Sequence, residues 1–192
     1  PGDGCDAQCD IEDGFYCNAP FNLTEASTEE WGGGSSWSIT NNGLTATQET
    51  NTEASVLVLD GFDPSLVAAT FDVTVQTTSD DDYIGFALGI EPGDATSATA
   101  DFLLIDWKQG TQSAFQGAQA YEGLALSRVQ GVSNNFDLWG HVNTVTELRR
   151  ATNLWLTGWA DNTTYDIEIE YDGNEMRLYV DGVLEIDVDE AE

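Results

Sequence analysis

Three consecutive carboxylates, Asp80, Asp81 and Asp82, stand directly before residues 83–88, in which large apolar and small side chains alternate. Calcium takes about six to eight oxygen ligands and favours adjacent carboxylates on a turn. Three neighbouring negative charges also repel one another unless a cation lies among them. We therefore expect these aspartates to bind calcium; the alternative is a solvated acidic turn. Further ligand oxygens are expected from loops that carry Asp94, Asp101 and Asp137.

A second set of carboxylates, Glu185, Asp187 and Glu190, lies close to the end of the sequence. Its spacing fits the ExDxxE pattern of laminarinase-like glycoside hydrolases, in which a retaining reaction needs two carboxylates about 5–5.5 Å apart. Strand alternation places Glu185 and Asp187 on the same side, but Glu190 would join them only through a β-bulge. Those enzymes also continue past the motif to complete their cleft. We therefore expect no enzyme activity and keep a glycosidase as an alternative.

Four tryptophans could contribute to a binding surface or to a core. Trp155 and Trp159 flank Thr157-Gly158 in a loop-like segment. Tryptophans in such loops can form an exposed platform for a ligand, so these two are the candidate ligand-binding residues. Trp107 and Trp139 are expected in the core.

The net charge of the chain argues against two classes of binding partner. There are 5 Lys and Arg residues against 35 Asp and Glu, a formal net charge of −30 at pH 7. Nucleic acid and anionic membrane surfaces repel such a protein, and no apolar run is long enough for membrane insertion. Because 41% of the residues are hydrophobic, the chain can still build a core. The carboxylates must then lie on the surface, where calcium or salt relieves their repulsion.

The cysteines predict an oxidising environment. Cys5, Cys9 and Cys17 all lie within the first 17 residues, and the rest of the chain has no cysteine. This crowding is typical of a small disulfide-containing module, and the odd number predicts one bond to a cysteine elsewhere. Zinc is the alternative, but paired CxxC elements are absent and the only histidine, His141, is distant. The sequence therefore predicts a protein that is secreted or exposed at the cell surface.

The remaining pattern is that of an all-β chain. Residues 67–75, 165–171, 176–180 and 184–188 alternate between apolar and polar side chains, and Asp-Gly steps separate the last three segments. We expect an antiparallel β-sandwich with one face packed and the other acidic, and a single helical turn at 144–147. The predicted organisation is a Cys-rich segment at 1–18, a polar Gly-rich linker at 19–34 and a sandwich at 35–192.

About 150 residues resemble the C-terminal, L-type-lectin-like domain of thrombospondins. The matching pieces, in order, are Trp37 and the segments GFDPSLVAATFDVTV, DDDYIGFALG, DFLLIDWKQGTQ, LW and NEMRLYVDGVLEIDV. This resemblance implies a concanavalin A-like jelly roll in which the DDDY segment borders a calcium-bearing rim. Two features depart from the family: residues 91–100 form a longer loop, and no further strand follows residue 188. A final strand is therefore expected outside this sequence or from elsewhere.

The first residues, PGDGCDAQCDIEDGFYC, resemble the end of an Asp/Cys-rich repeat found in secreted proteins of myxobacteria and other Gram-negative bacteria. Together the resemblances imply a calcium-binding adhesion or recognition module of a secreted or surface-attached bacterial protein. Its ligand would be a glycan or a protein or peptide. A non-catalytic spacer stiffened by calcium is the alternative function.

Overall fold

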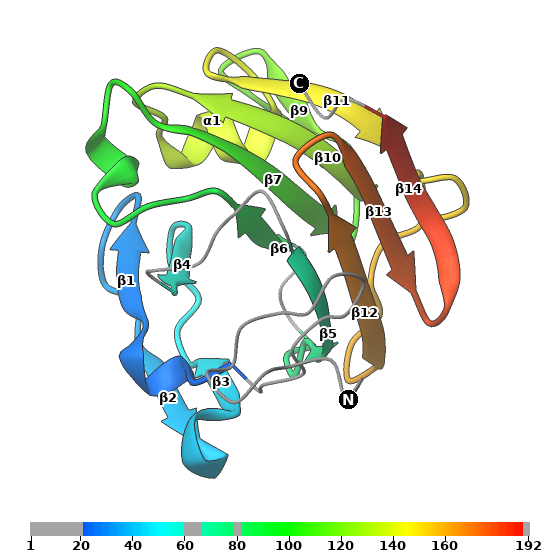
Figure 1. Cartoon of the computed structure of the whole chain (residues 1–192). Coiled ribbons are helices and arrows are strands. Elements are labelled where there is room, and N and C mark those ends of the chain that lie inside the picture. Colours follow the sequence, from blue (N-terminus) through cyan, green and yellow to red (C-terminus); the bar gives the residue numbers. More distant parts are fainter. Residues whose placement is uncertain (1–20, 60–66, 79–81, 190–192) are drawn as a thin grey trace.

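The computed structural model describes residues 21–59, 67–78 and 82–189, which form an antiparallel β-sandwich with a third, partial layer (Figure 1). The predicted all-β fold is confirmed. The elements are η1(Leu23–Glu25), β1(Ser27–Glu30), β2(Trp37–Thr40), η2(Asn41–Gly43), β3(Thr45–Gln48), β4(Ser55–Val58), β5(Val67–Thr74), β6(Tyr83–Leu88), η3(Asp94–Thr96), β7(Asp101–Lys108), β8(Gln112–Phe115), β9(Ala118–Ala120), β10(Gly123–Gln130), α1(Asn135–Gly140), β11(Val145–Arg150), β12(Thr164–Tyr171), β13(Glu175–Val180) and β14(Val183–Asp189).

One sheet of the sandwich, which we call the acidic sheet, has the strand order β14-β13-β12-β5. Its strands alternate as the sequence predicts: along β12, Ile167 and Ile169 are buried while Asp166 and Glu170 are exposed. The turn between β13 and β14 is made by Asp181 and Gly182, both with positive φ (51° and 74°), as a tight hairpin requires.

One arginine, Arg177, lies among several carboxylates on the outer face of the acidic sheet. The Arg177 guanidinium lies 2.8 Å from Glu175, 3.5 Å from Asp187 and 3.8 Å from Glu170. These groups are solvated, so each pair contributes little stability. The predicted acidic face is thus present on this sheet.

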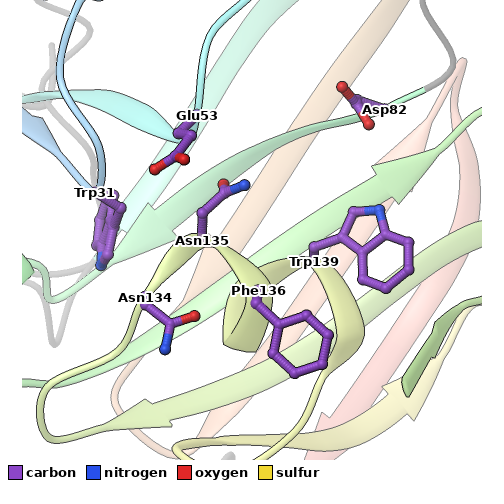
Figure 2. A pocket seen from close by; sticks show the side chains of 7 residues that line it. All are labelled: Trp31, Glu53, Asp82, Asn134, Asn135, Phe136 and Trp139. Atoms are coloured by element: carbon purple, nitrogen blue, oxygen red, sulfur yellow. The ribbon is translucent and has the colours of Figure 1, made fainter. Parts of the chain in front are cut away.

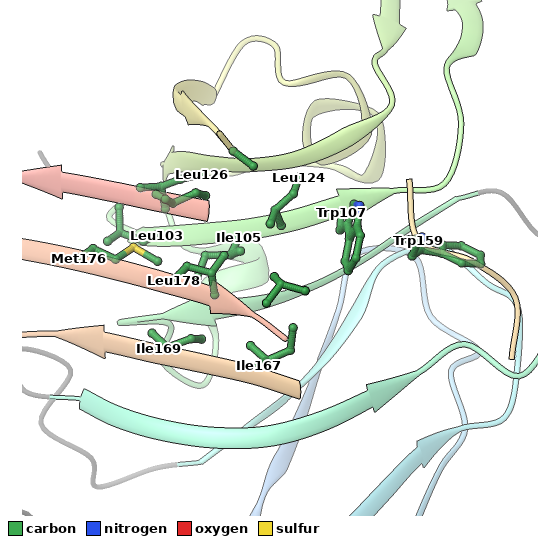
Figure 3. Close-up of a cluster of buried hydrophobic side chains, with 13 residues drawn as sticks. Leu103, Ile105, Trp107, Leu124, Leu126, Trp159, Ile167, Ile169, Met176 and Leu178 are labelled. Carbon is green, nitrogen blue, oxygen red and sulfur yellow. The ribbon is translucent and has the colours of Figure 1, made fainter. Parts of the chain in front are cut away.

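The other sheet, which we call the central sheet, has the order β11-β10-β7-β6, and its two middle strands are buried on both faces. Every residue of β7 after Asp101 is buried. The expectation of one packed and one acidic face is therefore wrong for this sheet. Its inner face packs on the acidic sheet through a core (Figure 3) of Leu103, Ile105, Trp107, Leu124, Leu126, Ile167, Ile169, Met176 and Leu178.

The third layer covers the outer face of the central sheet. A second core cluster there combines Phe102 and Leu104 of β7 with Leu138 of α1 and, partly buried, Trp31. Trp31 directly follows β1, which pairs with β4. Residues 27–30 therefore form a strand, although the sequence predicted a linker at 19–34. The predicted Cys-rich segment at 1–18 lies outside the described residues.

The helix of this layer lies earlier in the chain than expected. Residues 145–147 of the predicted helical turn at 144–147 belong to strand β11 (Val145–Arg150), so this prediction is wrong, and the helix α1 is Asn135–Gly140. Because β11 pairs with the edge of β10, tertiary pairing decides the conformation of this segment.

A β-bulge in β14 changes which side chains point inward. The register between β13 and β14 shifts after Leu178, so that Glu185 and Ile186 are both buried. The Glu185 carboxylate accepts hydrogen bonds from the backbone N–H groups of Asn153 and Leu154, at 2.8 and 3.1 Å. The Glu185 carbonyl also accepts the N–H of Thr152 at 2.7 Å. This glutamate thus anchors the loop after β11 to the edge of the acidic sheet.

We predict that Glu185→Gln lowers the free energy of unfolding by about 1–3 kcal/mol. Both backbone N–H groups bond to Oε2, and Asn153 Nδ2 donates to Oε1 at 3.3 Å, so the amide nitrogen of a glutamine would face a donor at either position. The negative charge that strengthens these hydrogen bonds is lost as well. Urea denaturation followed by tryptophan fluorescence measures the change.

The control is Glu170→Gln, which removes one charge from the exposed face of the same sheet. An unfolding free energy for Glu185→Gln that equals that of the control would show that the Glu185 hydrogen bonds do not hold the loop.

Candidate ligand-binding site

The short helix α1 is fixed at both ends by side chains of its own neighbourhood. At its start, Asn134 and Asp137 form a capping box, with Asn134 Oδ1 accepting the Asp137 N–H at 3.1 Å and Asp137 Oδ2 accepting the Asn134 N–H at 3.1 Å. At its end, His141 adopts a left-handed conformation (φ 49°) and its N–H bonds to the Asp137 carbonyl. A helix of this length is stable only through such contacts.

A cavity of about 410 Å³ opens between α1 and the segments that precede β4 and β6 (Figure 2). Four of its residues come from the start and body of α1, and three come from segments far away in the sequence. The lining residues are Trp31, Glu53, Asp82, Asn134, Asn135, Phe136 and Trp139.

Aromatic rings form the apolar part of this cavity. Phe136 and Trp139 are stacked, with ring centroids 6.1 Å apart and an interplanar angle of 28°. Trp31 packs against Phe102 of the core at 6.3 Å, and its indole N–H donates to Ser133 Oγ at 3.2 Å. Trp139 was expected in the core, but it is only partly buried and lines the cavity. Its place on α1, which sequence periodicity did not reveal, accounts for the difference.

The polar part of the cavity contains an amide of fixed orientation. Asn135 Oδ1 accepts the Ala54 N–H at 2.9 Å and the Tyr83 hydroxyl at 3.3 Å. Burial, together with the negative charges of Asp106, Asp82 and Glu53, raises the pKa of Tyr83, so its hydroxyl remains a donor. With Oδ1 committed to two donors, the amide nitrogen of Asn135 is the group that can donate to a ligand (Figure 2).

Asp82 forms one end of the cavity and lies beside the segment that follows β7. Gln112 Nε2 donates to Asp82 Oδ1 at 3.0 Å, and the indole N–H of Trp139 donates to Gln112 Oε1. Tyr83 also pairs with Lys108 in the sheet, so the segment around Asp82 lies beside the end of β7.

A network of charges, buried at Asp106 and Lys108 and extending to the surface at Glu147, holds the C-terminal end of α1 against β7. Asp106, which is fully buried, accepts hydrogen bonds from Lys108 Nζ and, at 2.8 Å, from His141 Nε2. The other ring nitrogen of His141 lies 3.0 Å from Glu147 Oε2, and Glu147 is bound in turn by Arg150 at 2.8 Å. Each buried charge therefore has a partner of opposite sign, as burial requires.

These contacts shift the pKa values of the network. Burial alone would lower the pKa of His141, but the neighbouring Asp106 and Glu147 carboxylates raise it above its ordinary value. Burial would raise the pKa of Asp106, yet Lys108 and His141 lower it. The pKa of Glu147 falls to about 2 against the effect of burial, because His141 and Arg150 bond to it. Lys108 Nζ lies 3.1 Å from His141 Nε2, and its charge lowers the pKa of His141, but the two carboxylates outweigh it. The imidazolium form, donating Nδ1–H to Glu147 and Nε2–H to Asp106, satisfies both carboxylates.

The predicted metal ligands are not gathered at one place. Asp82 lies at the cavity, while Asp80 and Asp81 lie outside the described residues. Asp101, at the opposite end of β7, binds Arg128 at 2.7 Å, and its pKa is lowered by that bond. Asp94 accepts the Glu91 N–H at 2.9 Å, and Asp137 is buried in the capping box of α1. In the described part of the chain, no three His, Cys, Asp or Glu side chains form a metal-sized cluster.

The two tryptophans predicted as an exposed platform have different environments. Trp155 is 51% exposed, and the neighbouring Leu156 is also exposed. Trp159 is 3% exposed and belongs to the core between the sheets, so its predicted role is wrong. Trp107 Nε1 donates to the Thr157 carbonyl at 2.8 Å and thereby draws the segment after Trp155 into the core. Trp107 is buried as expected.

The carboxylates of the ExDxxE pattern do not form the expected pair. Glu185 is 3% exposed and binds the loop after β11, whereas Asp187 is exposed beside Arg177. The bulge in β14 breaks the alternation on which the expectation depended. Glu190 lies outside the described residues.

Residues 33–184 match the family described as the thrombospondin C-terminal region. The chain belongs to this family. Thrombospondin-1 of Xenopus laevis is 31% identical over 144 residues, and thrombospondin-2 of Homo sapiens and the cartilage oligomeric matrix protein of Rattus norvegicus are each 29% identical over 143 residues. Each alignment covers 67% of this chain but only 11%, 11% and 18% of the respective relative. The chain therefore corresponds to a small part of these proteins.

A solved structure shares the architecture of this thrombospondin-type domain. The carbohydrate binding module CBM66 from Bacillus subtilis matches with a TM-score of 0.53 and 13% identity, over 86% of this chain and 80% of that chain. At this identity the similarity concerns the fold. In the described residues, no helix is long and apolar enough to cross a membrane.

We predict that the stability of the domain falls as the pH rises from 6.5 to 8. The folded state raises the pKa of His141, so the folded protein keeps a proton that the unfolded chain loses above about 6.5. The contribution of His141 to the free energy of unfolding is fully present below that pH and is lost as the pH rises through the pKa of the folded state. The free energy of unfolding then falls by at most about 1.4 kcal/mol per pH unit. Denaturant unfolding at several pH values measures this slope.

The matched variant is His141→Asn, which removes the only histidine and should give a flat profile between pH 6.5 and 8. A wild-type profile that is equally flat would contradict a charged His141 in the folded protein.

Proposed function

We propose that this domain is a lectin-like recognition module that binds an extracellular glycan in the cavity beside α1, with calcium at the neighbouring Asp80, Asp81 and Asp82. The observation that carries the proposal is the lining of the cavity. It combines three aromatic rings with carboxylate and amide groups on one concave surface.

Such a lining matches the two kinds of surface that a sugar ring presents. The C–H face of a sugar is apolar and packs on an aromatic ring, while its hydroxyls donate and accept hydrogen bonds. The stacked Phe136 and Trp139 provide the apolar contact. Glu53 and Asp82 can accept hydrogen bonds, and the amide nitrogen of Asn135 can donate one. Because the rings and the amide are held by contacts to the core, little ordering is needed on binding.

The proposal of calcium is supported by the position of Asp82. It stands at the rim where residues before β6 and after β7 meet, and two further carboxylates precede it directly. Asp80, Asp81 and Asp82 are hard oxygen ligands of the kind that calcium requires. A cation at this place would also offset the repulsion of a chain with net charge −30.

A secreted or cell-surface location is part of the proposal. It is supported by the family to which the chain belongs and by the three clustered cysteines, Cys5, Cys9 and Cys17, which are proposed to form disulfides. A protein or peptide ligand and a purely structural spacer are the competing outcomes of the binding experiment.

We predict that a glycan array and a peptide panel, each run with calcium and with EDTA, identify a glycan ligand. Trp139→Ala should weaken that binding about tenfold or more, because truncation of a contacting aromatic side chain commonly costs more than 1 kcal/mol. Isothermal titration with the selected glycan measures the dissociation constants of the variants.

Trp155→Ala is the matched control, because Trp155 is exposed and does not line the cavity. If Trp155→Ala loses the binding and Trp139→Ala keeps it, the ligand site is not this cavity. If the arrays give only peptide ligands, the glycan assignment is wrong, and if nothing binds, the domain is a spacer.

A separate prediction concerns the metal. Calcium at a hundredfold excess over its dissociation constant should stabilise the domain by about 2.7 kcal/mol, so EDTA should lower the melting temperature. Replacing Asp81 by Asn should reduce the difference between the calcium and EDTA samples. A melting temperature and fluorescence spectrum that EDTA leaves unchanged would contradict the calcium site.

A further inference from the structure

We infer that the glycan bound in this cavity carries a protonated amine, which lies between the Glu53 carboxylate and the ring of Trp31. This inference rests on the proposed function and specifies its ligand as an amino sugar with a free amine. The remaining part of the cavity would hold the rest of that sugar against Phe136 and Trp139.

Glu53 and Trp31 are close together in space, although they are far apart in the sequence. The Trp31 N–H donates to the Ala54 carbonyl at 2.9 Å, which joins the two segments. The Glu53 side chain lies over Gly32, since a Cβ atom at that glycine would fall 2.8 Å from Glu53 Cβ. Figure 2 shows Glu53 and Trp31 at the same end of the cavity, away from Asp82.

The charge of this end of the cavity is negative and is not balanced by a basic side chain. No lysine or arginine is among the residues that line the cavity. Within the described ranges, the Glu53 carboxylate has no hydrogen bond or ion pair of its own, and it is exposed. The basic residues that form ion pairs do so elsewhere: Lys108 with Asp106, Arg128 with Asp101, Arg150 with Glu147 and Arg177 with Glu175.

A carboxylate beside an indole ring is a suitable environment for an ammonium group. The negative face of the ring attracts a cation, and the carboxylate accepts its hydrogen bonds. An anionic sugar would be repelled by the charge of Glu53. The hydroxyls of a neutral sugar could donate hydrogen bonds to this carboxylate, but only an ammonium group also brings the opposite charge. Calcium at the Asp82 end would neutralise the charge of Asp82 but not the charge of Glu53. The amine and the metal can therefore bind at the same time.

The experiment compares two ligands with the same sugar backbone, one with free, charged amines and one with neutral N-acetyl groups. Isothermal titration is carried out at pH 6 in 150 mM salt, with calcium, using the β-1,4-linked tetramer of glucosamine and its fully N-acetylated counterpart. At this pH the free amines of the glucosamine tetramer carry protons, whereas the N-acetyl groups are neutral. We expect the free-amine tetramer to bind about tenfold more tightly or better, as one favourable cation–π and carboxylate contact allows.

Variants separate a specific contact from general attraction to an acidic protein. Glu53→Gln should abolish the preference for the free amine. Glu170→Gln, which removes one charge from the exposed acidic sheet, should retain it. A preference that persists in Glu53→Gln, or that is also lost in Glu170→Gln, would overturn the inference.

Two further outcomes are informative. Equal affinity for both tetramers would overturn the inference and leave the proposed glycan site intact, whereas the absence of any glycan ligand on the array would remove the proposed function itself. Trilysine, added as a third titrant, tests the competing ligand class. Tight binding of trilysine without binding of the glucosamine tetramer would assign the amine to a peptide and not to a sugar.

Discussion

The pairing of buried charges on the outer face of β7 is the interaction on which the third layer depends. Asp106 has no access to water, so its carboxylate is tolerable only while Lys108 and His141 bond to it. His141 is the residue that ends α1, and its second nitrogen is held by Glu147 of β11. One network therefore fixes the end of the helix to two strands of the central sheet. Breaking such a network by removing one member typically costs about 3–5 kcal/mol.

The position of α1 in turn determines the cavity. The helix brings Phe136 and Trp139 to the surface, while Leu138, on another side of the same helix, packs into the outer core. Trp31 and Glu53 lie outside the two main sheets, next to strands β1 and β4. The pairing of these two strands places both residues opposite the helix. The middle strands of the central sheet are thus buried on both faces, because one face forms the sandwich and the other supports the site. This arrangement differs from a simple two-layer sandwich with a solvated outer face.

The fold could be predicted from the sequence because local rules decided it: alternation along residues 165–171 and the Asp181-Gly182 turn specify the acidic sheet. The site could be predicted only in part. Asp82 was found from its charge, but α1 has six residues and too little periodicity to be recognised, so Trp139 was assigned to the core. His141 was considered only as a zinc ligand, because its partners Asp106 and Glu147 meet it through tertiary pairing. The prediction for Glu185 was wrong because the bulge in β14 turns this side chain inward. The prediction for Trp159 was wrong because the hydrogen bond from the Trp107 indole to Thr157 brings this segment against the core.

The most direct test of this account is the protonation state of His141, the only histidine in the chain. Long-range nitrogen–proton correlation NMR of the ¹⁵N-labelled protein at pH 7 gives a single imidazole, so no assignment is needed. We predict that both ring nitrogens carry a proton, with slowly exchanging N–H signals, since each donates to a carboxylate. A neutral imidazole with one unprotonated nitrogen at pH 7 would contradict the charge network, and with it the explanation for how α1 and the cavity are held in place.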